Sequence, residues 1–196
     1  MDGVVLSGPK AHLLGHVRSL RHSRDGDIET KYQMRRLAQD SGKYLSSLHN
    51  IYDLTLHNTR VEHISEDAFC ACFSAFRGAL TSLFLDTCVT SFSAFVTLVD
   101  YFPNITTLKL SLFALEPDEG PIPPLSRPLR GKVHVRRAHA NRLEFFNRFS
   151  KLHLEYEELI IDSPFVFVET EFLESALQIS ASTVKFLRVT AELGRK

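Results

Sequence analysis

Leu80-Thr81-Ser82-Leu83-Phe84-Leu85 is the stretch that decides the fold, because its apolar-x-x-apolar-x-apolar pattern recurs along the chain. The alternation of apolar and other residues in its second half is typical of a β-strand with one face in the core. Four other stretches keep all three apolar positions, namely residues 51–56, 105–110, 156–161 and 184–189. A unit that recurs in this way decides the architecture before any local pattern does.

The spacing of the recurring stretch predicts a repeat protein. Its first apolar positions lie 25 to 29 residues apart, except for one interval of 51 residues that ends at Tyr156. Arg130-Gly-Lys-Val133-His-Val135 lies inside that interval and keeps the second and third apolar positions, with Arg130 at the first. Val17–Leu20 fits as a first, longer repeat. These intervals are those of leucine-rich repeats, although only Cys88 clearly meets the Asn/Cys position of that pattern.

Seven such repeats predict an α/β fold. We expect a right-handed leucine-rich-repeat-like solenoid, with about seven parallel strands on one face and helices and one proline-rich loop on the other. One helix should begin after Ser91 and end before Pro103, because Phe92, Phe95 and Val99 recur at helical spacing between them. Further helices are expected within residues 30–48, 65–80, 143–149 and 172–177.

The domain organisation follows from the extent of the repeats. We expect residues 16–196 to form a single irregular leucine-rich-repeat-like domain after a short N-terminal segment, residues 1–15. Residues 116–128 hold five of the eight prolines, so an extended loop should replace the helix of that repeat. The alternative for Pro121-x-x-Pro124 is a ligand for an SH3-like partner.

Composition and charge narrow the class of protein. The 23 basic and 23 acidic residues give zero net charge, so no global field attracts nucleic acid or a membrane. Three cysteines leave one unpaired, which favours a reducing compartment. Met1–Leu14 holds no apolar run of signal-peptide length, and no stretch of the chain is apolar enough to span a bilayer. We therefore expect a cytoplasmic or nuclear protein that binds neither nucleic acid nor membrane.

The residues between the apolar positions of each strand are expected to line the exposed face of the sheet. This face mixes polar and charged side chains with a few apolar ones, so it could accept a protein or peptide partner. The alternative is a sheet face that is merely solvated. The candidate partner-binding residues are Asp53, Thr55, His57, Ser82, Phe84, Asp86, Thr107, Lys109, Lys132, His134, Arg136, Glu158, Ile160, Phe186 and Arg188.

A basic cluster surrounds the fifth repeat. By repeat order, its strand should lie beside the strand that carries Glu157 and Glu158, which predicts cross-strand charge pairing. The alternative is an anion or RNA site, but aromatic residues are not interleaved with the charges as single-strand binders need. The cluster consists of Arg130, Lys132, Arg136, Arg137 and Arg142.

The sequence holds no motif for catalysis or metal binding. Cys70-x-Cys72 has no second pair to complete a zinc site, so both cysteines are expected in the core. The nine histidines include no H-E-x-x-H, and the chain has no P-loop, dinucleotide-binding or nucleophile-elbow sequence. We therefore expect no catalytic residue, no metal and no cofactor, and an enzyme is the least favoured class of function.

Residues 101–110, 116–131 and 182–188 resemble the fungal F-box proteins with degenerate leucine-rich repeats. The resemblance implies repeats that hold a substrate protein, whereas the F-box of such proteins binds the Skp adaptor of a cullin ubiquitin ligase. Residues 1–15 are too short for an F-box, so only the repeat region is implied. We expect a non-catalytic protein–protein interaction module. The alternative is a complete ligase adaptor that acts through a missing N-terminal segment or a partner, with an indirect link to Skp.

The last repeat predicts an incomplete end of the array. Its strand should end near Thr190, which leaves only Ala191–Lys196 to cover it. Because solenoids need capped ends, we expect an exposed apolar C-terminal strand, and with it dimerisation, fraying or a missing extension.

Overall fold

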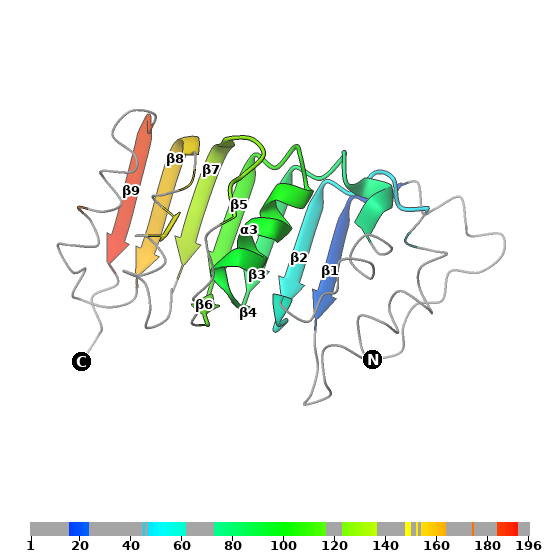
Figure 1. Cartoon of the computed structure of the whole chain (residues 1–196), viewed down its shortest axis with the longest axis horizontal. Coiled ribbons are helices and arrows are strands. Elements are labelled where there is room, and N and C mark those ends of the chain that lie inside the picture. Colours follow the sequence, from blue (N-terminus) through cyan, green and yellow to red (C-terminus); the bar gives the residue numbers. More distant parts are fainter. Residues whose placement is uncertain are drawn as a thin grey trace.

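Seven parallel strands form the main sheet in a computed structural model of the chain (Figure 1). The structure describes residues 16–23, 45, 47–61, 73–116, 123–136, 148–149, 152, 154–163, 174 and 184–191. In chain order, which is also their order in the sheet, the strands are β1 (Ser19–Ser23), β2 (Asp53–His57), β3 (Ser82–Asp86), β5 (Thr107–Ser111), β7 (Leu129–Arg136), β8 (Leu154–Ser163) and β9 (Phe186–Ala191). The predicted α/β class with seven parallel strands is confirmed.

Equivalent positions of the repeated stretch are partners across the sheet. Leu83 of β3 pairs with Leu54 of β2 on one side and with Leu108 of β5 on the other. The same column continues through Val133 of β7 and Leu159 of β8, and all five side chains are buried. The spacing of the apolar positions in the sequence therefore sets the pairing register of the strands.

The turn after three successive strands has the same conformation. Asn58, Thr87 and Leu112 each follow the last residue of a strand and have φ values of 50°, 56° and 48°. Their backbone N–H groups donate to the last carbonyl of the next strand in the sheet, at 2.9, 2.8 and 3.1 Å. Residues other than glycine rarely adopt positive φ, so the recurrence of this backbone conformation at equivalent positions marks a repeated structural unit.

A second, short ladder follows these turns. β4 (Val89–Thr90) pairs in parallel with β6 (Ala114–Leu115), and Arg60 forms an isolated bridge with Val89. Each repeat of this region thus contributes one segment to the main sheet and one to the short ladder.

Helix α3 (Phe92–Tyr101) covers one face of the sheet near β3 and β5 (Figure 1). The hydroxyl oxygen of Ser91 accepts a hydrogen bond from the backbone N–H of Ala94 at 3.2 Å, which caps the first turn. The buried side chains of the helix pack into the core with the buried residues of the strands. The ring of Phe95 lies edge-on to the ring of Phe113, with 5.6 Å between the two ring centroids. The predicted helix between Ser91 and Pro103 is confirmed.

Other expected elements fall partly outside the described residues. Of the helix expected within residues 65–80, the described part contains the single 3₁₀ turn η3 (Ser74–Phe76). The helices expected within residues 30–48, 143–149 and 172–177 lie largely outside, as do residues 1–15, residues 117–122 and the pair Cys70 and Cys72. Residues 123–128, the described part of the proline-rich stretch, contain neither helix nor strand.

The entry into β7 differs from the expectation that Arg130 occupies the first apolar position. Leu129 is buried instead, and Arg130 is exposed. The reason is Gly131, whose φ is +91°, and a register shift between Gly131 and Lys132 that leaves Glu157 as an extra residue in β8. The chain therefore reaches the regular register only from Lys132 onward.

The sheet ends at β9 with apolar side chains exposed. The exposed fractions are 51% for Phe186, 38% for Leu187 and 37% for Val189, whereas the equivalent residues of β8, Leu159 and Ile161, are buried. The expected exposed apolar end is confirmed, while dimerisation, fraying or an extension stays a prediction. Within the described ranges, no helix is long and apolar enough to cross a membrane.

Replacing Gly131 by alanine should destabilise the fold by at least about 2 kcal/mol. A Cβ atom at this position would lie 2.1 Å from the carbonyl oxygen of Thr106, which is backbone and cannot move aside. Gly78→Ala is the matched control, because a Cβ there meets nothing within 4 Å. Urea denaturation followed by circular dichroism measures both free energies of unfolding, and equal values for the two variants would contradict the assigned backbone strain.

Candidate partner-binding face

The face of the sheet opposite the core is built from three rows of side chains. Each row runs across all seven strands because its members are register partners. The amino row is Ser19, Asp53, Ser82, Thr107, Lys132, Glu158 and Phe186; the middle row is Arg21, Thr55, Phe84, Lys109, His134, Ile160 and Arg188. The carboxyl row is His57, Asp86, Ser111, Arg136 and Asp162, and its backbone register continues to positions 23 of β1 and 190 of β9. We call the three rows together the outward face.

All fifteen residues predicted to bind a partner lie in these rows, and none of them is buried. On β2, β3, β5, β7 and β8 their neighbours along the strand belong to the buried apolar columns, so alternation along the strand places these candidates on the other face. On β9 the alternating residues Leu187 and Val189 are themselves exposed. The structure thus brings the predicted residues together on one surface. Their role in binding stays a prediction.

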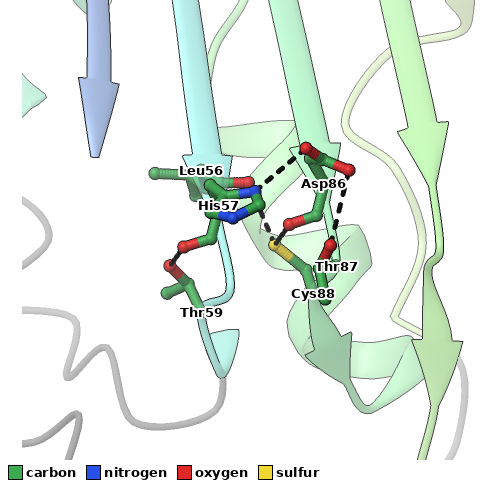
Figure 2. A network of polar contacts seen from close by, with 6 residues as sticks. All are labelled: Leu56, His57, Thr59, Asp86, Thr87 and Cys88. Carbon is green, nitrogen blue, oxygen red and sulfur yellow. Dashed lines mark hydrogen bonds and ion pairs between the residues drawn. The ribbon is translucent and has the colours of Figure 1, made fainter. Parts of the chain in front are cut away.

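His57 and Asp86 form the best-connected polar contact of the outward face (Figure 2). The imidazole Nδ1 of His57 on β2 lies 2.9 Å from the Oδ2 atom of Asp86, its register partner on β3. Behind this pair, the thiol of Cys88 donates to the carbonyl oxygen of Leu56 at 3.2 Å, and the hydroxyl of Thr59 donates to that of His57 at 3.0 Å. The pair is therefore supported by the turns that follow both strands.

Cross-strand ion pairs join β7 to β8. Arg130 contacts Glu155 at 2.7 Å and Lys132 contacts Glu158 at 2.6 Å, so the charge pairing predicted for the basic cluster is confirmed at these two positions. His134 reaches diagonally to Asp162 at 2.7 Å. Arg137 and Arg142 lie outside the described residues. Partly exposed pairs of this kind contribute about 0–1 kcal/mol each, so they fix side-chain positions more than they stabilise the fold.

Glu157 departs from the expected pairing with the basic cluster. It is the extra residue at the register shift, and its Oε1 atom accepts a hydrogen bond from the Nζ atom of Lys185 at 2.8 Å. This hydrogen bond, together with the positive charge of Lys185, lowers the pKa of Glu157 below its ordinary value. The pair follows the register of β8 with β9, because Glu158 is the partner of Phe186 and the preceding residues Glu157 and Lys185 therefore lie opposite each other.

A groove lies at the edge of the sheet where the strands begin, and the repeat pattern did not indicate it. It has a volume of about 720 Å³, and its polar lining includes Thr81, Asn104, Thr106, Arg127 and Arg130. The Arg127 guanidinium donates to the carbonyl of Phe102, while its Nε atom is buried and has no hydrogen-bond partner among the described residues. Burial lowers the pKa of Arg127, opposed by the attraction of Asp100.

The described part of the chain brings together no group of three or more His, Cys, Asp or Glu residues that could hold a metal ion. Cys88 is buried and its thiol faces backbone carbonyl groups, which is an arrangement for packing and hydrogen bonding. The geometry of the outward face is that of an extended surface of fixed charges and a few apolar side chains.

Replacing Lys185 by glutamine should raise the pKa of Glu157 toward its ordinary value. In the folded protein the lowered pKa gives a stabilisation that is present above the unfolded pKa and is lost as the pH falls through the folded value. The measurement is a carboxyl-carbon NMR titration of Glu157 in the native chain and the variant. Lys109→Gln serves as the control, since no ion pair joins Lys109 to Glu157. An unchanged titration midpoint in Lys185→Gln would refute the assigned cause.

Comparisons with known proteins assign no family to this chain. No protein-family model matches it, and no curated protein matches its sequence significantly. The resemblance to F-box repeat regions therefore stays an expectation, and the function is argued from the geometry of the outward face.

Proposed function

We propose that this chain is a non-catalytic protein-binding module whose outward face contacts a protein or peptide partner. The observation that carries the proposal is the continuity of that face: three rows of side chains in register across seven strands, with no buried candidate among them. Phe84 and Ile160 are partly exposed on it, and Phe186 is exposed. Exposed apolar residues within a polar surface are typical of recognition sites.

We also propose that the architecture is a right-handed leucine-rich-repeat-like solenoid. The recurring positive φ at Asn58, Thr87 and Leu112, and the short ladder that follows these turns, support a unit repeated along one axis. Strands that neighbour in sequence also neighbour in the sheet, as stacked repeats require. Right-handed connection of parallel strands is the general rule.

The dimensions of the outward face fit a peptide, a helix or one lobe of a folded partner. Seven strands about 4.8 Å apart span roughly 29 Å across the sheet. The link to a cullin ubiquitin ligase, through a missing N-terminal segment or a partner, is the alternative within this proposal and rests on the resemblance of residues 101–110, 116–131 and 182–188. Co-purification with the Skp adaptor tests this link separately.

Combined replacement of Phe84, Lys109, His134 and Phe186 by alanine should reduce partner recovery at least tenfold in a quantitative pull-down, because it removes apolar and charged contacts from four of the seven strands. Arg77 and Thr97 are exposed and lie outside the outward face, so their double alanine variant is the control and should retain the partner. Both variants must melt cooperatively. Unchanged recovery with the outward-face variant would rule out this face as the binding site.

A further inference from the structure

The middle row of the outward face carries positive charge and no carboxylate. Arg21, Lys109 and Arg188 lie on β1, β5 and β9, which are separated by three strand spacings each. All three side chains are exposed, and none forms an ion pair within the part of the chain that the structure describes. The positive charge of this row is therefore available to a partner.

The carboxylates of the flanking rows are largely engaged elsewhere. In the amino row, Glu158 is held by Lys132 at 2.6 Å. In the carboxyl row, Asp86 contacts His57 at 2.9 Å and Asp162 contacts His134 at 2.7 Å. The contacts of Glu158 and Asp86 stay within their own rows, whereas Asp162 reaches His134 of the middle row. None of these contacts involves Arg21, Lys109 or Arg188. Asp53 is the remaining carboxylate of the outward face, and it lies on β2, beside β1.

Apolar side chains alternate with the cations in a regular order. From β1 to β9, a cation, a polar residue and an apolar residue follow one another twice, and a third cation ends the row. The residues in this order are Arg21, Thr55, Phe84, Lys109, His134, Ile160 and Arg188. With strands about 4.8 Å apart, successive cations are about 14 Å apart. An extended peptide advances about 3.4 Å per residue, so residues i and i+4 span the same distance and face the same side.

We propose that the middle row binds an acidic peptide segment in which two carboxylates four residues apart face Lys109 and Arg188, with an apolar residue between them on Ile160. This inference rests on the proposed function and specifies the chemistry of the partner. Charge complementarity across exposed surfaces mainly sets specificity and association rate, so the apolar contact supplies part of the affinity. A single-stranded nucleic acid would also bring negative charge, but the middle row offers one aromatic side chain, Phe84, where base stacking uses several.

A random peptide display library, selected on the immobilised full chain, tests the inference. Selection should enrich Asp or Glu at two positions four residues apart with an apolar residue between them. For a synthetic peptide of the enriched sequence, Kd should rise about two- to fivefold in Lys109→Gln and about tenfold or more in Lys109→Glu. Arg77→Gln removes the same charge away from the outward face and should leave Kd unchanged.

A charge exchange identifies the contact. A peptide with lysine in place of the acidic residue opposite position 109 should bind Lys109→Glu more tightly than it binds the native chain. Absence of this reversal would overturn the assigned contact. Cooperative melting of each variant shows that a lost affinity does not reflect unfolding.

The remaining outcomes separate this inference from the function on which it rests. Enriched peptides without acidic residues, whose binding is lost in Phe84→Ala, would retain the outward face as a binding site and overturn its acidic specificity. Peptide binding unaffected by any change in the middle row would overturn both. Tighter binding of a fluorescent single-stranded oligothymidine than of any enriched peptide, lost in Lys109→Gln, would replace the peptide by a nucleic acid.

Discussion

Alignment of two buried apolar columns is the constraint on which the rest of the structure depends. One column contains Leu54, Leu83 and Leu108, and the next contains the residues two positions further along each strand. A slip of one residue in any strand would turn its leucines toward solvent and its polar residues into the core. The order of the outward face is therefore a consequence of the core: burial of the columns fixes which residues lie opposite one another on the other side.

This constraint explains why the charges of the outward face fall into two kinds. Where the register places opposite charges within reach, as for Lys132 and Glu158, they pair across the strands. In the middle row the register brings Lys109 between Phe84 and His134, and no carboxylate lies beside it in the row. The same register thus pairs several charges of the flanking rows and leaves Arg21, Lys109 and Arg188 of the middle row outside the ion pairs of the described residues, in a chain of zero net charge.

The sequence was sufficient for the strands and the rows, because both follow from a period of two and a repeated spacing. It did not reveal the unusual backbone conformations or their effect on which residues are buried. Thr87 and Leu112 adopt positive φ although neither residue type favours it, since the turn is imposed by the strands that it joins. Leu129 takes a buried position expected of Arg130 because Gly131 bends the chain. The contact between Glu157 and Lys185, by contrast, follows from the equivalent positions of these residues in the stretches 156–161 and 184–189.

The register shift at Gly131 has a consequence for how the chain can vary in length. Between the register pairs Gly131–Tyr156 and Lys132–Glu158, β8 contains one extra residue. From Lys132 and Glu158 onward, all pairs of β7 and β8 are in regular register. The extra residue is absorbed where the strands begin, before the rows of the outward face. Insertions and deletions at that edge leave the order of exposed side chains intact. The interval between repeats and the surface that they display are thus free to evolve separately.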